Sequence, residues 1–171
     1  TIKPEIKTLG FMYNPGEANS VSNLEKAKSF CAAKNIKLIE SAVTTISDVQ
    51  TNAQVLVTKT DAIFVPNDNT VASAMSALAN EANKAKIPVF VGADSMVMDG
   101  GFATVGIDYE ELGKETAHMV DDILNGKQAA DIPVKVFKDD LNVYINEKVL
   151  KTLGITLPES ISNNEKLQMI K

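Results

Sequence analysis

The sequence has few of the residues on which metal centres, disulfide frameworks and nucleic-acid surfaces depend. Its 171 residues include one cysteine, Cys31, one histidine, His118, and no tryptophan. One cysteine and one histidine exclude a disulfide framework, a zinc finger and any His/Cys metal cluster within one chain. Aromatic residues make up only 5% of the chain, which argues against a base-stacking platform for single-stranded nucleic acid.

Positive charge and long apolar runs are also scarce. Lys and Arg number 17 against 22 Asp and Glu, a net charge of −5, so no nucleic-acid partner is expected. No apolar run approaches the ~18 residues that a membrane helix needs. No signal or transit segment is present and the first residue is Thr1, so we expect a processed chain or a fragment.

What remains is the composition of an ordinary globular domain, with 44% hydrophobic and 23% charged residues. Short apolar runs alternate with helical periods, which predicts an α/β fold with a doubly wound, mostly parallel sheet, a flavodoxin-like lobe. The tail from Pro158 onward is polar, and we expect it to be loosely ordered. The predicted strands are residues 6–14, 36–43, 62–66, 88–93, 102–107, 134–137 and 141–145. The predicted helices are residues 20–34, one beginning near Ser47, and residues 70–86, 109–125 and 147–153.

Short polar side chains follow several of these strands. In an open parallel sheet, ligands bind at the carboxyl ends of the strands. The helix N-termini behind residues 19–20 and 69–70 favour an anionic group, and nearby carboxylates can receive an ammonium, so the edge suits a zwitterion. The same residues would also serve simply as helix caps and turn formers. The candidate ligand-binding residues are Asn14, Glu17, Asn19, Ser20, Asn67, Asp68, Asn69, Thr70, Asp94 and Ser95.

Catalytic alternatives are few. His118 lies about 130° from the apolar stripe of its helix, so we expect it to be exposed. Cys31 lies within an apolar stripe and is expected to be a buried, inert thiol. A small flavodoxin-like enzyme could gather Asp68, Asp94 and Asp108 around Mg²⁺, because hard cations need only oxygen ligands. No nucleotide-binding or hydrolase motif supports this alternative, and neither a cofactor nor a resident metal is expected.

Five segments, in this order and spacing, resemble the ABC-transporter substrate-binding proteins of the tryptophan/tyrosine type. They are residues 13–20 (YNPGEANS), 61–74 (DAIFVPNDNTVASA), 104–113 (TVGIDYEELG), 141–146 (LNVYIN) and 153–158 (LGITLP). The resemblance implies a type I periplasmic binding protein, in which two α/β lobes close around a ligand. It also implies that Asn67, Asp68 and Asp94 touch this ligand.

The resemblance divides the chain into residues 1–101 as the second lobe, residues 102–139 as a crossover that completes the first lobe, and residues 140–171 as the return. It implies a non-catalytic protein that captures a small solute for an ABC permease, and it favours an amino acid, in particular an aromatic one. It further implies an exported lipoprotein, with signal and lipid anchor absent from this chain. A sensor lobe of a regulator is a third reading, although no basic helix-turn-helix segment is present.

If the crossover belongs to another lobe, the helix at residues 109–125 lacks its natural partner. Its stripe of Leu112, Met119, Val120 and Ile123 is then large enough to drive association. We therefore expect this helix either to pack on a neighbouring chain or to fold back on the sheet.

Overall fold

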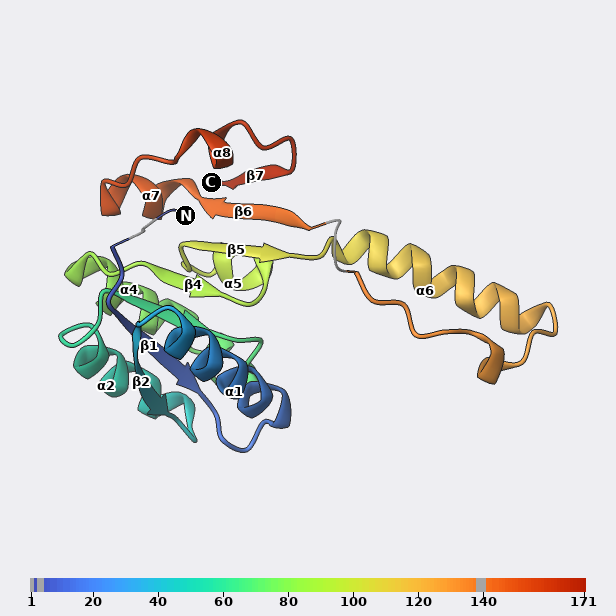
Figure 1. Ribbon diagram of the computed structural model, residues 1–171, viewed down its shortest axis with the longest axis horizontal. Helices are drawn as coiled ribbons and strands as arrows, with labels where there is room; N and C mark the ends of the chain where they lie inside the picture. Colours follow the sequence, from blue (N-terminus) through green and yellow to red (C-terminus); the bar gives the residue numbers. More distant parts are fainter. Residues whose placement is uncertain (1, 3–4, 138–140) are drawn as a thin grey trace.

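A single seven-stranded sheet organises the computed structural model, which describes residues 2, 5–137 and 141–171. The strand order is β2-β1-β3-β4-β5-β6-β7 (Figure 1). Strands β1 to β5 are parallel, β6 is antiparallel to β5, and β7 is parallel to β6, which confirms the predicted fold class. The strands are β1 Thr8–Tyr13, β2 Lys37–Ala42, β3 Ala62–Val65, β4 Val89–Val91, β5 Ala103–Gly106, β6 Asn142–Asn146 and β7 Leu167–Ile170.

Helices cover the two faces of the sheet unequally. Helix α1 packs on one face, where Leu24 meets Phe11 and Tyr13. Helices α2 to α5 pack on the opposite face around Met12 and Ile63. Because successive residues of a strand point to opposite faces, β1 supplies both cores. The helices are α1 Ala18–Ala33, α2 Ile46–Leu56, α3 Asn69–Ala72, α4 Met75–Ala85, α5 Asp94–Met98, α6 Tyr109–Leu124, α7 Glu147–Leu153 and α8 Glu159–Ser162, with a 3₁₀ turn at Ala129–Asp131.

The expected burial of Cys31 and the expected exposure of His118 are confirmed. Cys31 is buried in α1, and its desolvation raises the pKa of the thiol. His118 is exposed on α6. None of the helices within the described residues is long and apolar enough to cross a membrane.

The C-terminal region differs from the prediction. The tail contains α8 and the edge strand β7, and Ile161 and Leu167 pack against the cluster around Ile145. A strand as short as β7 has little signal in its own sequence, and its pairing with the neighbouring strand β6 stabilises it. Residues 134–137, predicted as a strand, form none, and among the described residues no strand lies beside them.

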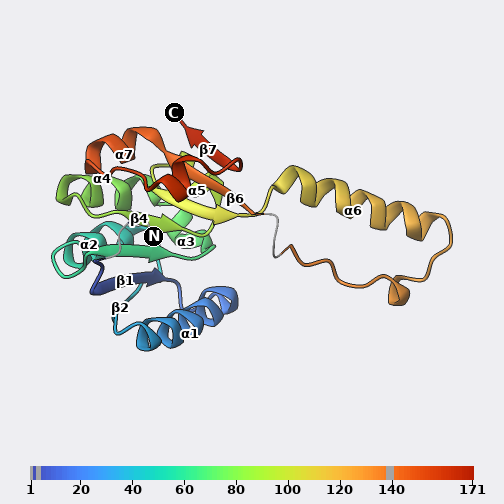
Figure 2. The same cartoon turned by 45° about the horizontal axis from the view of Figure 1, so that its top comes forward.

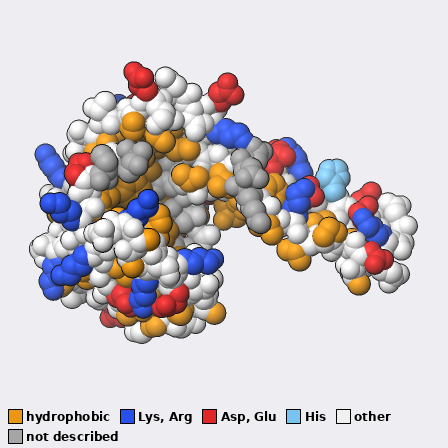
Figure 3. Space-filling view, in the orientation of Figure 1, with side chains coloured by type: hydrophobic (Ala, Val, Ile, Leu, Met, Phe, Trp, Pro, Cys, Tyr) orange, Lys and Arg blue, Asp and Glu red, His pale blue; other side chains and the backbone are white. Residues whose placement is uncertain are grey.

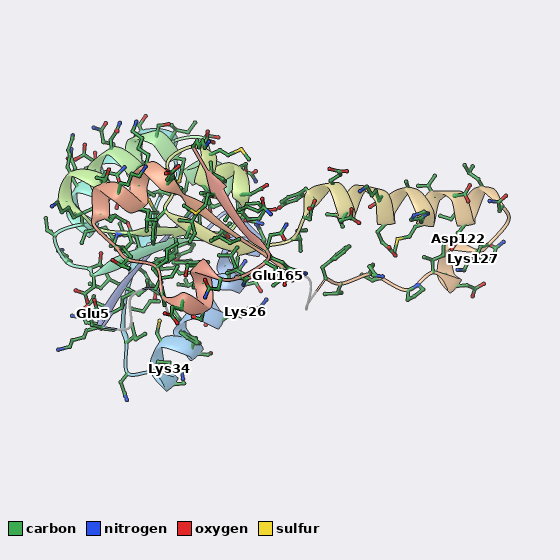
Figure 4. The ribbon with its side chains drawn as sticks, turned by 90° about the horizontal axis from the view of Figure 1, so that it is seen from above. Glu5, Lys26, Lys34, Asp122, Lys127 and Glu165 are labelled. Atoms are coloured by element: carbon green, nitrogen blue, oxygen red, sulfur yellow. The ribbon has the colours of Figure 1, made fainter. Side chains whose placement is uncertain are left out.

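Helix α6 and the chain that follows it form an arm, residues 107–137, that projects from the body (Figures 1 and 2). No residue of α6 is buried. Leu112 and Met119 border a shallow hollow of about 360 Å³ against the returning segment at Ile132 and Val134. An ion pair of 2.9 Å between Asp122 Oδ2 and Lys127 Nζ closes the far end (Figure 4). The expectation that α6 folds back on the sheet is therefore wrong, and packing on a neighbouring chain stays a prediction.

Candidate functional site

The loops after β1, β3 and β4 meet at one edge of the sheet, beside the start of the arm. There they form a pocket of about 300 Å³, called here the edge pocket. Polar side chains dominate its lining, and one aromatic ring joins them from α6. The lining residues are Asn19, Asn67, Asp68, Asn69, Ala72, Ala93, Ser95, Met96 and Tyr109.

A buried carboxylate holds two of these loops together. Asp68 is only 1% exposed. Its Oδ2 accepts hydrogen bonds from the backbone N–H of Asn14 (2.6 Å) and from the hydroxyl of Ser20 (2.7 Å). Its Oδ1 accepts from the N–H of Val71 at 3.0 Å and so caps α3. Since Ser20 is buried as well, Asp68 and Ser20 position the loops beneath the edge pocket.

The N-terminus of α3 is already filled by an anion from the chain itself. The carboxylate of Glu17 accepts from the N–H groups of Asn69 (3.0 Å) and Thr70 (3.2 Å), and from the side-chain amide of Asn69 (3.0 Å). The expectation that this helix end is open to a ligand's carboxylate is therefore wrong. Exposed N–H groups attract the nearest carboxylate, which here comes from the loop after β1.

Two further side-chain amides join the loops after β1 and β3. Asn14 donates from Nδ2 to the hydroxyl of Thr70 at 2.8 Å and accepts from the N–H of Gly16. Asn19 donates to the backbone carbonyl of Asn67 at 2.6 Å. Asn14 and Thr70 thus contact each other, whereas Asn19 and Asn67 also line the edge pocket.

Asn67 lies directly over Gly92, at the end of β4. A Cβ added to Gly92 would come within 2.7 Å of the backbone nitrogen of Asn67 and would collide with its side-chain oxygen. Only glycine permits this approach, since it has no Cβ. Gly92 thereby brings the loop after β3 against the loop after β4.

Asp94 and Ser95 open helix α5 at the same edge. Strands β3 and β4 are paired, so Asn67 and Asp94 follow neighbouring strands, as the sequence predicts. Ser95 is exposed and lines the edge pocket, whereas Asp94 is half-buried beside it and is not part of the lining. Asp94 Oδ1 accepts a hydrogen bond of 2.8 Å from the N–H of Ser95.

Tyr109 also lines the edge pocket and is not among the ligand-binding residues predicted from the sequence. It is the first residue of α6 and is half exposed. Asp108 fixes this end of the helix, because its Oδ1 accepts from the N–H groups of Glu110 and Glu111. The signal available in the sequence was the position of Asp108 and Tyr109 directly after a predicted strand.

The three aspartates proposed for Mg²⁺ have separate roles. Asp68 is buried among its own hydrogen bonds, Asp94 binds the N–H of its neighbour, and Asp108 caps α6. Among the described residues, the structure contains no group of three or more Asp, Glu, His or Cys side chains that could hold a metal ion. The geometry therefore does not support the magnesium enzyme.

Comparison with known proteins gives a consistent result. Residues 1–167 match the family model described as ABC transporter substrate binding protein. A tyrosine-binding protein of Clostridioides difficile (strain R20291) is 35% identical over 155 residues, which are 91% of this chain and 45% of that protein.

Two solved structures resemble the whole chain. A conserved domain protein from Vibrio cholerae is 40% identical with a TM-score of 0.88, over 99% of this chain and 56% of that one. An ABC domain from Streptococcus pneumonia in complex with L-Trp is 34% identical with a TM-score of 0.88, over 99% of this chain and 57% of that one. The chain thus spans about half the length of these relatives, and the superposed part includes the arm.

Proposed function

Because the chain belongs to the ABC transporter substrate-binding protein family, we propose that it supplies one lobe of a two-lobed protein that captures a small zwitterionic amino acid. The family consists of binding proteins rather than enzymes, so the edge pocket is assigned no reaction. The observation that carries the proposal is the position of this pocket. It gathers amide and hydroxyl groups at the carboxyl edge of the sheet, where the arm leaves toward the first lobe.

The amino and carboxylate groups of the ligand have different partners in this proposal. Asn67 and Ser95 are exposed in the lining, and their amide and hydroxyl groups can donate hydrogen bonds to a carboxylate. The amide of Asn19 can do the same if it releases its hydrogen bond to the backbone carbonyl of Asn67. The ammonium group binds the carboxylate of Asp94, which lies beside the edge pocket and accepts a hydrogen bond from the N–H of its neighbour Ser95. Among the other candidates, Asn69 lines the pocket. Asp68 lines it as well, and Asn14, Glu17, Ser20 and Thr70 join the loops around it through hydrogen bonds.

We further propose that the ligand's side chain is aromatic. Tyr109 presents a half-exposed ring at the edge pocket, where an offset or edge-to-face ring contact can form. Two relatives point the same way, since one is named for tyrosine and another is solved with L-Trp. The rest of the ligand contacts the first lobe.

The division into lobes is part of the proposal. Residues 1–101 and 140–171 build the lobe described here. Of the proposed crossover, residues 102–139, strand β5 pairs within this sheet, and the chain leaves from Ile107 onward. Closure of the lobes is a hinge motion that the ligand stabilises. Family members are extracytoplasmic, and we propose an exported lipoprotein that delivers its ligand to a membrane permease.

Calorimetry on the complete two-lobed protein tests this function. L-Tyr and L-Trp are the ligands, and L-Ala is the comparison that lacks the ring. Asp94→Ala is expected to weaken binding by about 30-fold or more, because a desolvated ammonium loses its charge partner. The matched control is Asp99→Ala, at the exposed opposite end of α5, which is expected to keep the affinity of the parent.

Asp61→Ala, at the opposite edge of β3, is also expected to keep the ligand affinity. It is the poorer control, because Asp61 accepts hydrogen bonds from the N–H groups of Lys7 and Thr8 that hold β1 to β3. Equal affinities for Asp94→Ala and the parent would show that another acid receives the ammonium. If calorimetry detects no heat of binding with L-Tyr, L-Trp or any other amino acid, the proposed function itself is overturned.

A further inference from the structure

Lysine side chains gather at the edge of the sheet opposite the edge pocket, called here the amino edge. Strands β1 to β5 begin at this edge, whereas β6 and β7 run the other way and end at it. Figure 3 shows Lys side chains along this edge of the body, on the side away from the arm. The exposed lysines here include Lys37 on β2, Lys7 before β1, Lys59 before β3, Lys84 and Lys86 before β4, Lys148 after β6, Lys171 after β7, and Lys34 after α1.

Few of these lysines are neutralised by neighbouring acids. Glu81 pairs with Lys84 at 3.1 Å, and Asp61 accepts hydrogen bonds from backbone N–H groups at the start of β1. Among the described residues, Lys37 and Lys59 form no ion pair. The amino edge is therefore positive, although the net charge of the chain is −5.

The helix dipole explains only part of this distribution. Cations are favourable near the C-terminus of a helix, and Lys34, Lys59 and Lys86 follow α1, α2 and α4. Lys7 and Lys37 stand at the starts of strands instead, where no helix end requires a positive charge. A second function of the edge is needed to account for them.

Exposed apolar side chains lie at the same edge. Helices α1, α2 and α5 start at the carboxyl edge and run back, so their last turns lie beside the lysines. Phe30 in the last turn of α1 is 59% exposed, Val55 in that of α2 is 50% exposed, and Met98 at the end of α5 is 62% exposed. Apolar side chains among lysines are typical of surfaces that bind a membrane, where lysines contact anionic headgroups and apolar groups enter the boundary with the acyl chains.

Resting on the exported lipoprotein proposed above, we infer that the amino edge binds an anionic lipid surface, with Phe30 and Val55 at the interface. The lysines extend from β2 to β7, six strand spacings or roughly 29 Å, which suits a surface of headgroups rather than one small anion. The basic residues of the chain are all lysines, whose point charges suit mobile headgroups, whereas a phosphorylated peptide is typically bound by the planar fork of Arg. The edge pocket lies at the opposite edge, so it stays accessible during this contact.

Vesicle sedimentation with the complete two-lobed protein, prepared without its lipid anchor, tests this inference. The charged vesicles contain phosphatidylglycerol in phosphatidylcholine, and pure phosphatidylcholine vesicles are the comparison. The parent should bind the charged vesicles at least about 10-fold more tightly, and added salt should weaken this binding. Lys37→Gln together with Lys59→Gln should weaken it about 10-fold or more. The matched control is Lys127→Gln together with Lys135→Gln, which removes the same charge from the arm and should keep the parent's binding.

Phe30→Ala tests the apolar part of the contact. It should weaken binding to the charged vesicles about 5-fold and leave the salt dependence unchanged, because a partly exposed ring is lost and no charge is removed. Val21→Ala, near the opposite end of α1, is the control and should bind like the parent. Circular dichroism checks that the variants are folded. A Phe30→Ala variant that binds like the parent would contradict the apolar contact.

Equal binding of the parent to the two kinds of vesicle would overturn the inference, as would equal losses in the edge and arm variants. Sedimentation without vesicles that disappears in the edge variant would also overturn it, because the partner would then be the acidic edge of a second copy. The result is separable from the proposed function, since calorimetry with L-Tyr should give the edge variant the affinity of the parent. A protein that binds L-Tyr but no vesicles retains the function without the membrane contact, and the opposite result retains the contact without the function.

Discussion

Helices α4 and α6 show how differently two amphipathic helices of one chain are used. In α4, the apolar face is buried against the sheet and includes Met75, Leu78 and Ala82. In α6, which is five residues longer, the apolar face with Ile123 and Leu124 is exposed. The periodicity of a sequence therefore predicts that a helix has an apolar face, and the topology of the fold determines whether another element covers that face.

The largest expected difference between the two helices comes from replacing one leucine in each of them by alanine. Leu78→Ala opens a cavity in the core and is expected to lower the free energy of unfolding by about 2–5 kcal/mol. Leu112→Ala removes a half-buried leucine from α6, a helix with no buried residue, and is expected to cost less than about 1 kcal/mol in this chain. Denaturant unfolding measures both values. Equal losses in the free energy of unfolding would contradict the different use of the two helices. A larger loss for Leu112→Ala in the two-lobed protein than in this chain would show that α6 is covered there.

An effect of similar size is expected from removing one acid in each region. Asp68→Ala leaves the buried N–H groups of Asn14 and Val71 without their acceptor, which costs roughly 1–3 kcal/mol for each unsatisfied group. Asp122→Ala removes an exposed ion pair with Lys127, and its effect should lie within the error of the measurement. Thermal unfolding distinguishes the two. An unaffected Asp68→Ala variant would mean that water replaces the carboxylate.

Glycine substitutions should change stability in opposite directions in the two regions. Gly92→Ala places a methyl group against the backbone of Asn67, so it should destabilise the body and weaken ligand binding in the two-lobed protein. Gly113→Ala meets nothing within 4 Å on α6 and should stabilise this helix by about 0.5–1 kcal/mol. Denaturant unfolding of both variants measures whether each substitution raises or lowers the free energy of unfolding. A neutral Gly92→Ala would show that the two loops separate easily.

The smallest expected effect depends on pH. Hydrogen bonds from the side chain and backbone N–H of Thr45, and from the N–H of Thr44, hold the pKa of Asp48 below its ordinary value at the start of α2. Its stabilisation is present above the ordinary pKa of about 3.9 and is lost as the pH falls through the lowered value. The difference in melting temperature between the parent and Asp48→Asn should therefore shrink on acidification. A difference that stays constant with pH would assign the effect to packing.

Much of the fold was predictable, because the strands of a parallel sheet are short apolar runs that local composition reveals. The strand beginning at Leu167 was missed, since its order comes from pairing with Val143 rather than from its own residues. At the candidate site, the edge and its polar loops were predictable. The role of Glu17 was not, because its partners Asn69 and Thr70 lie more than fifty residues away.

The two ends of the arm are joined to the body side by side. Gly106, the last residue of β5, and Asn142, the first residue of β6, are direct partners across an antiparallel pair. A segment attached through a single flexible linker can rotate about any axis, whereas a segment attached through two neighbouring connections is restricted, like a strap. A strap bends about the axis through both connections and resists twisting and sliding. The pairing of Gly106 with Asn142 therefore restricts rotation of the arm about its own length and leaves bending about the line through these two residues.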